Sequence, residues 1–168
     1  LKSLPEPIVK IIMAQIFKTS DDIAELAMKK FEETGLEHIG INLKVLSTTK
    51  AKTILNISRA SLILNNLTHN GIILVIYEDA FDRLSDEYKE ILMEGIFSNV
   101  SYDSEKDKIN VDNDSAKQIY RMRRKYPNYV DIAETSYAVI EQIIEEEKQR
   151  KEEERRIKQE EKAAKKRQ

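Results

Sequence analysis

The apolar residues of this chain fall into periodic groups that predict alternating strands and helices. Six consecutive apolar or aromatic residues at 72–77, IILVIY, have strong β propensity and no polar alternation, which is typical of a strand at the centre of a sheet. Residues 39–45 alternate between apolar and polar positions and predict a half-buried strand. We expect residues 51–58 to pair with it antiparallel across a turn at 47–50.

Two helices are predicted ahead of the sheet. Pro7 opens an apolar run, and proline in a first helical turn costs little, so we expect a short helix over 7–17. Burial in the core and docking on a partner both account for its apolar surface. Ser20 suits an N-cap and Gly35 a left-handed stop, and apolar residues recur at helical spacing between them, which predicts a helix over 21–34.

A capped helix is predicted after the central strand. Ser85 is suited to its N-cap, and the acidic residues that follow favour the helix dipole. Its expected buried stripe consists of Ile91, Leu92, Gly95 and Ile96. Glycine inside a helix costs about 1 kcal/mol unless close packing requires it. A shorter helix, over 60–67, is predicted before the strand.

A hairpin and a further helix complete the predicted domain. Residues 100–102 and 109–111 alternate with period two on either side of the polar turn SEKD, which is typical of a hairpin. Asn113 or Asp114 is expected to cap a helix over 115–126 that ends before the next proline.

The chain loses its apolar residues after Ile144. We expect Asp131 to cap the last helix, whose buried side ends there. Residues 141–168 contain nine acidic and ten basic residues and no coiled-coil seam. Acidic residues precede basic ones by four in the pairs Glu146 and Arg150, Glu147 and Lys151, Glu152 and Arg156, Glu154 and Lys158, and Glu161 and Lys165. This predicts an exposed single helix that frays toward its end, either as a solubilising terminus or as a binding arm.

The predicted fold class is therefore α+β, with a small, mostly antiparallel sheet and helices packed on it. At 168 residues and 40% hydrophobic content, the chain can bury one core. We expect one domain over 1–140, divided into N-terminal helices (1–36), sheet and central helix (38–112) and C-terminal helices (113–140). The charged helical tail, 141–168, follows it.

Composition excludes several function classes. The absence of cysteine excludes disulfides, thiolate zinc sites and a cysteine nucleophile. With four glycines, the chain has neither a Walker loop nor a dinucleotide-binding fingerprint. No apolar run approaches the roughly 18 residues of a membrane span, and the first residues lack the features of a secretory signal. We therefore expect a cytoplasmic protein that does not enter a membrane. The formal net charge of −2 does not by itself favour binding to nucleic acid.

The element order and the segment LVIYEDAFDRLSDEYKEILMEGI resemble the metallopeptidase-like proteins of bacteriophages, a zincin-like family, over about residues 38–103. In that family an acidic residue ends the apolar strand, and the next helix carries H-E-x-x-H, whose histidines bind zinc and whose glutamate activates water. Glu78, Phe81 and Leu84 match the approach to this helix, and Glu94 falls at the motif glutamate.

The departures from the family pattern imply that the zinc site is lost. With Glu94 at the motif glutamate, Met93 and Phe97 occupy the two histidine positions. The chain has only two histidines, His38 and His69, and neither is adjacent to this helix in sequence. The resemblance therefore implies a member without zinc, cofactor or enzymatic activity, in which Glu94 is an ordinary solvated residue.

One cluster of side chains could carry binding. Four basic residues lie three or four positions apart and share a helix face, with a tyrosine between them; this basic patch comprises Lys117, Tyr120, Arg121, Arg124 and Lys125. Such a face can contact phosphates or an acidic protein surface, or it can be a solvated helix face. We therefore expect a non-catalytic phage accessory protein that binds a host or phage protein in the host cytoplasm, as an adaptor or inhibitor. The alternative is a nucleic-acid-binding accessory protein that uses the basic and aromatic residues of 117–129.

Overall fold

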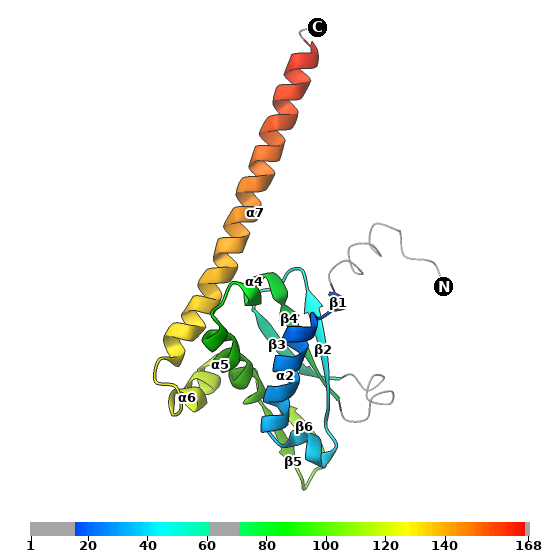
Figure 1. Cartoon of the computed structure of the whole chain (residues 1–168), viewed down its shortest axis with the longest axis vertical. Helices are drawn as coiled ribbons and strands as arrows, with labels where there is room; N and C mark the ends of the chain where they lie inside the picture. The colour runs from blue at the N-terminus through cyan, green and yellow to red at the C-terminus, as the bar shows by residue number, and fades with distance from the viewer. Residues whose placement is uncertain (1–15, 61–70, 167–168) are drawn as a thin grey trace, which may run out of the picture.

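The computed structural model describes residues 16–60 and 71–166, which form an α+β fold with a long projecting helix (Figure 1). The elements in chain order are β1 (Ile16–Lys18), α2 (Asp21–Glu33), the 3-10 helix η1 (Leu36–Ile39), β2 (Asn42–Thr48), β3 (Leu55–Arg59), β4 (Gly71–Tyr77), α4 (Glu78–Asp82), α5 (Asp86–Phe97), β5 (Val100–Asp103), β6 (Lys108–Val111), α6 (Ser115–Arg123) and α7 (Tyr129–Lys166). The predicted α+β class is thus confirmed.

The apolar strand β4 lies inside a mixed four-stranded sheet of order β1-β2-β4-β3. Its Ile72, Leu74 and Ile76 are completely buried, as the run of apolar residues predicts. The strand β2 pairs with β4 in parallel, whereas β3 pairs with β4 antiparallel. The expected hairpin between 39–45 and 51–58 is therefore wrong. Both strands instead flank the most apolar segment of the chain, which places that segment where burial is greatest.

Several predicted boundaries also shift. The predicted helix over 7–17 is wrong at its end, because Ile16 and Phe17 belong to β1, an edge strand antiparallel to β2. The other residues of this predicted helix lie outside the described part of the chain. Residues 61–67 of the predicted helix over 60–67 also lie outside it. The strand β2 begins after Ile39 and continues through residues 47 and 48, which were expected in a turn. Ser47 is completely buried there.

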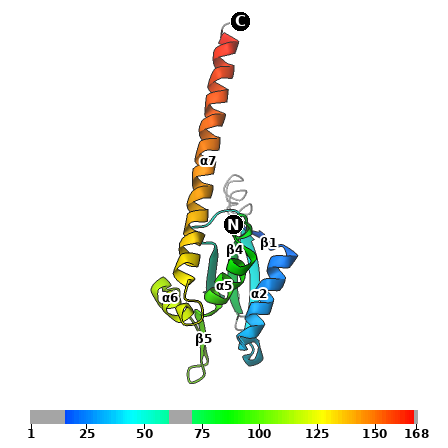
Figure 2. The same cartoon turned by 60° about the vertical axis from the view of Figure 1, so that its left-hand side comes forward.

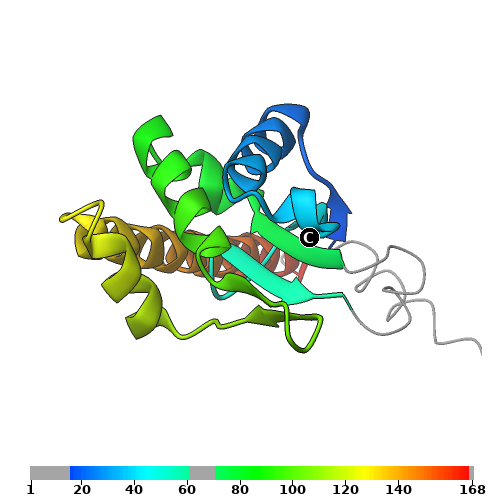
Figure 3. The ribbon, with the colours of Figure 1, turned by 90° about the horizontal axis from the view of Figure 1, so that it is seen from below.

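The helices α2 and α5 lie together on one face of the sheet (Figure 3). The rings of Phe31 on α2 and Phe97 on α5 pack with their centroids 5.8 Å apart. The predicted cap of α5 is confirmed, since the Ser85 hydroxyl accepts the Tyr88 N–H at 3.3 Å. The predicted buried stripe of α5 is also confirmed, with Gly95 among its buried residues.

The hairpin and the helix after it follow the prediction closely. In the two-stranded sheet of β5 and β6, Val100 pairs with Val111 and Tyr102 pairs with Ile109. Of the two candidate caps for α6, the structure uses Asp114, whose carboxylate accepts the N–H groups of Ala116 and Lys117.

The helix α7 is one unbroken helix of 38 residues that crosses position 140 and leaves the domain (Figure 2). It begins at Tyr129, so Asp131 lies in its first turn and is not its cap. Ile132, Ile140 and Ile143 are buried. Ile144 was expected on the same buried side, and that prediction is wrong, because Ile144 is 55% exposed. None of the described helices combines the length and apolar character needed to cross a membrane.

The ion pairs of α7 differ from those expected from i, i+4 spacing. Glu146 does not pair with Arg150 but accepts two hydrogen bonds from Arg83, at 3.0 and 2.8 Å. Arg156 pairs with Glu153 and Glu160. The contact with Arg83 joins α7 to the end of α4 and fixes the direction in which the helix leaves the domain.

Candidate functional site

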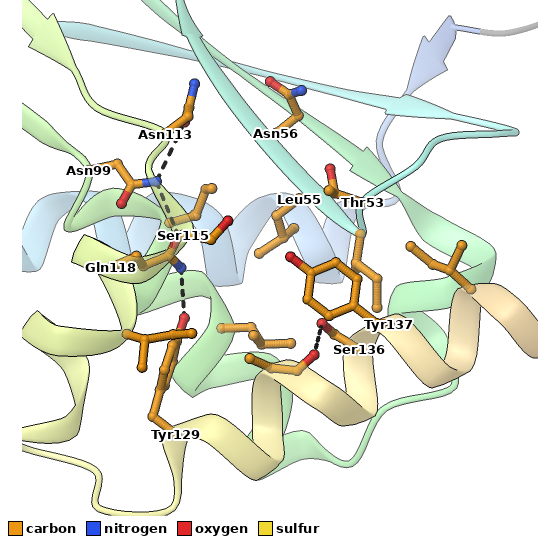
Figure 4. A pocket seen from close by; sticks show the side chains of 16 residues that line it. Thr53, Leu55, Asn56, Asn99, Asn113, Ser115, Gln118, Tyr129, Ser136 and Tyr137 are labelled. Carbon is orange, nitrogen blue, oxygen red and sulfur yellow. Dashed lines mark hydrogen bonds between the residues drawn. The ribbon is translucent and has the colours of Figure 1, made fainter.

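A cleft of about 200 Å³ opens between β3, α5, α6 and α7 (Figure 4). Residues 53–56 form one wall, and α7 forms the opposite wall with Tyr129, Ala133, Ser136, Tyr137 and Ile140. Leu92 and Ile96, one helical turn apart on α5, contribute hydrocarbon to its lining. Amide side chains line the remaining side. The cleft thus combines an apolar part with many neutral polar groups.

Three of the amide side chains, those of Asn99, Asn113 and Gln118, are joined in one hydrogen-bonded network (Figure 4). The Arg121 guanidinium donates to Asn99 Oδ1 at 2.6 Å. Asn99 Nδ2 donates to Gln118 Oε1 at 3.2 Å and to Asn113 Oδ1 at 3.4 Å. Gln118 Nε2 then donates to the Tyr129 hydroxyl at 2.7 Å. These bonds fix the orientation of each amide, so the cleft presents defined donors and acceptors.

Gly95 makes the position of Tyr129 possible. A Cβ atom at residue 95 would overlap the Tyr129 hydroxyl and would lie 3.0 Å from both Tyr129 Cζ and Gln118 Nε2. Tyr129 is only 1% exposed, so its ring has little room to move. Glycine at position 95 lowers the intrinsic stability of the helix, but close packing beneath the cleft requires it.

The hydrogen bonds at both ends of β3 show which of its backbone groups bind β4. Tyr77 N–H donates to the Ile54 carbonyl at 2.8 Å, and Ala60 N–H donates to the Gly71 carbonyl at 2.9 Å. In an antiparallel pair, the residues that exchange hydrogen bonds alternate along the strand. Even-numbered residues of β3 therefore bind β4, and odd-numbered residues direct their backbone groups to the outer edge.

The outer edge of β3 lies beside the cleft. Leu55 lines the cleft, and its N–H and C=O groups belong to the outward set. Further along, the Ile57 carbonyl accepts a hydrogen bond from Asn113 Nδ2 at 3.1 Å. The side chain of Arg59 donates to the Ile109 carbonyl of β6 at 3.2 Å. Asn113 and β6 thus contact the half of β3 from Ile57 to Arg59, and Leu55 lies in the other half.

The lining of the cleft contains no carboxylate, imidazole or amine. Burial raises the pKa of Tyr129, and the hydrogen bond from Gln118 opposes that rise only in part, so the hydroxyl stays protonated. Zinc binds thiolate, imidazole and carboxylate ligands. Leu92, Ile96 and the surrounding amides do not fit zinc, and the described residues contain no group of three potential His, Asp or Glu ligands.

The residues predicted at the histidine positions of the zinc motif lie away from the cleft. Met93 is completely buried and Phe97 is 2% exposed, in the core. The prediction that Glu94 is an ordinary solvated residue is wrong, because its carboxylate accepts hydrogen bonds from Lys125 Nζ at 2.7 Å and Tyr126 Oη at 2.6 Å. Burial alone would raise the pKa of Glu94, but these two hydrogen bonds outweigh it and lower the pKa.

The predicted basic patch is dispersed among intramolecular partners. Lys117 pairs with Asp112 at 3.0 Å, and Lys125 pairs with Glu94 at 2.7 Å. Arg121 turns into the amide network of the cleft. Arg124 lies over the ring of Tyr120, 5.2 Å from its centroid, and Tyr120 is 65% exposed. The structure therefore places Arg121 against Asn99, outside the lining of the cleft, and leaves Tyr120 and Arg124 as an exposed pair.

Sequence reasoning missed the residues that build the cleft, namely Asn99, Asn113, Gln118 and Tyr129. Asn99 follows α5, Asn113 follows β6 and Gln118 lies within α6. Their convergence depends on tertiary packing that no local pattern contains. Comparison with known proteins gave no match among family models, curated proteins or solved structures.

Proposed function

We propose that this chain is a non-catalytic accessory protein of phage type that acts in the host cytoplasm by binding a host or phage protein. The proposed binding site is the cleft beside β3, and its ligand is an extended, uncharged segment of the partner. One observation carries the proposal: Leu55, whose backbone groups are directed to the outer edge of β3, lines a cleft whose polar groups, among the described residues, are neutral.

An extended peptide matches this wall chemically. A peptide beside β3 can exchange backbone hydrogen bonds with Leu55, which is the usual way in which a strand is added to a sheet edge. Its side chains would alternate between the hydrocarbon of Leu92 and Ile96 and the amides near Asn99. Uncharged side chains are preferred because the lining offers no ionised partner for a buried charge.

The same chemistry supports a non-catalytic role. General acid–base catalysis needs a group with a pKa near the working pH, and nucleophilic catalysis needs an activated nucleophile. The cleft lining contains neither a carboxylate nor an imidazole, and burial raises the pKa of Tyr129 away from neutrality. The hydroxyl of Ser136, which donates to the Ala133 carbonyl at 2.6 Å, has no adjacent base in this lining.

We also propose that the scaffold is zincin-like and has lost its metal. In the alignment of α5 with the zinc helix, Met93 and Phe97 occupy the two histidine positions, and both side chains are buried in the core. Apolar core residues in place of metal ligands support a scaffold that is retained as a binding surface.

Nucleic-acid binding through the basic patch is the second candidate. The exposed pair of Tyr120 and Arg124 favours it, because bases stack on tyrosine and phosphates bind arginine. Lys117, Arg121 and Lys125 oppose it, because their charged groups already have intramolecular partners. We therefore rank it below peptide binding.

The test is selection of a random peptide display library on the full chain, followed by affinity measurements on the enriched peptides. Ala133→Trp fills the cleft from α7, and Ala163→Trp, on the exposed part of the same helix, is the matched control. We expect enriched, uncharged peptides whose affinity falls at least about tenfold, about 1.4 kcal/mol, in Ala133→Trp and is unchanged in the control. Failure to enrich any peptide, or equal binding by both variants, would contradict the proposal.

A further inference from the structure

The part of α7 beyond Ile144 extends away from the domain (Figure 2). At about 1.5 Å per residue, the helix from Ile144 to Lys166 is about 33 Å long. Glu146 accepts hydrogen bonds from Arg83, and among the described residues it is the last residue of α7 to bond to the rest of the domain. The rest of this segment is almost entirely exposed, so its helical state must depend on interactions within the segment.

Charges of alternating sign form a continuous row along this segment. The row has spacings of four, three, four, three and four, and consists of Glu147, Lys151, Glu154, Lys158, Glu161 and Lys165. Residues three or four apart are neighbours on a helix surface, so every neighbouring pair in the row is of opposite sign. Each four-residue step has the acid on the N-terminal side, which is the more favourable orientation.

The ion pairs and hydrogen bonds that the structure shows along this segment involve residues outside the row. Arg156 pairs with Glu153 at 2.8 Å and with Glu160 at 3.7 Å, which links successive turns on either side of it. Gln149 donates to Glu145 across one turn at 3.3 Å. Lys165 and Lys166 lie in the last turn, where positive charge is favoured by the helix dipole. A helix of this length with such pairs is above the range in which isolated helices are marginal.

Association of two such helices is not favoured by these side chains. Ile157, at 45% exposure, is the one large hydrophobic residue of the described segment beyond Ile144, so no apolar seam is available. Exposed ion pairs contribute little against the translational and rotational freedom lost on association. The segment is therefore expected to stand alone.

We infer that α7 beyond Ile144 is a self-supporting, rigid spacer that holds its basic end at a fixed distance from the cleft-bearing domain. This inference does not depend on what the cleft binds. Its basis is the order of charges along the part of α7 beyond the contact of Glu146 with Arg83, where the side chains are almost entirely exposed.

The absence of cysteine in the chain allows a direct distance measurement. Gln142 and Gln159 are exposed and uncharged, so both can be replaced by cysteine and spin-labelled in the full chain. Seventeen helical residues separate them, which corresponds to about 26 Å along the axis. We expect pulsed electron paramagnetic resonance to give one narrow distance distribution consistent with this separation, independent of protein concentration.

A variant of identical composition tests the cause of the rigidity. Exchanging Glu for Lys and Lys for Glu at all six positions of the row keeps the net charge but reverses the order in each four-residue step. We expect a broader distribution and lower helical circular dichroism in this variant. A broad distribution in the parent chain, an additional concentration-dependent distance from a second copy, or an exchange variant as narrow as the parent would overturn the inference.

Discussion

Replacing Gly95 with alanine is expected to destabilise the protein, although alanine is the better helix former. The added Cβ would overlap the Tyr129 hydroxyl and would approach Tyr129 Cζ and Gln118 Nε2 to 3.0 Å. Tyr129 is the first residue of α7, and its side chain packs against α5 and α6. Because it is 1% exposed, its ring cannot turn into solvent. The new methyl group must therefore push apart packed helices.

One stabilising and two destabilising contributions determine the expected change in the free energy of unfolding. Alanine in place of a mid-helix glycine stabilises by about 1 kcal/mol. Overpacking a buried site costs about 1–3 kcal/mol. Loss of the hydrogen bond from Gln118 to Tyr129, which measures 2.7 Å, costs about 1 kcal/mol. We therefore expect Gly95→Ala to lower the free energy of unfolding by about 1–3 kcal/mol.

Tyr129→Phe provides the control, because it removes the oxygen atom that the new Cβ would overlap. In that background, Gly95→Ala should be close to neutral or slightly stabilising. The assay is urea unfolding followed by circular dichroism for all four members of the double-mutant cycle, with a coupling energy of about 2 kcal/mol expected. A stabilising Gly95→Ala in the parent chain, or a coupling energy near zero, would refute the packing described here.

Two further outcomes are expected. The pKa of Glu94 is lowered in the folded state, so the contribution of its carboxylate to the free energy of unfolding is present above its ordinary pKa of 4.5 and is lost as the pH falls through the folded pKa. The difference in the free energy of unfolding between the parent chain and Glu94→Gln, measured by urea unfolding, should therefore disappear in acid. A difference that does not change with pH would contradict this. Glu78→Ala should cost about 2–3 kcal/mol, because Glu78 accepts hydrogen bonds at 2.7 Å from the buried Ser47 hydroxyl and from the Ser20 N–H; thermal unfolding tests it, and a neutral effect would remove these bonds from the account.

Local patterns predicted the elements of this fold better than their partners. The apolar run of β4, the Ser85 cap of α5 and the hairpin at 100–111 depend on residues close in sequence, and each was correctly predicted. The pairing of β2 was not, because β2 and β3 are close in sequence and both have strand character. Their separation by β4 follows from competition for the buried centre of the sheet, which is a property of the whole chain.

The cleft was beyond prediction for the same physical reason. Its walls come from segments as distant as Leu55 and Tyr137, and its amides are ordinary polar residues until packing brings them together. Glu94 shows the converse error. Its helical position suggested a solvated carboxylate, but Lys125 and Tyr126, which follow α6, donate hydrogen bonds to it. Spacing along one helix cannot reveal a partner that arrives from another element.

Amide hydrogen exchange at the edge of β3 is the most direct test of the central claim, that the cleft binds an extended peptide. The N–H of Leu55, a residue that lines the cleft, is directed to the outer edge of β3, whereas that of Asn56 already binds β4. With a selected peptide bound to the full chain, residue-resolved exchange should slow at Leu55 and change little at Asn56. Bound peptide with unchanged exchange at Leu55 would show that the edge of β3 is not the binding site and would contradict the account.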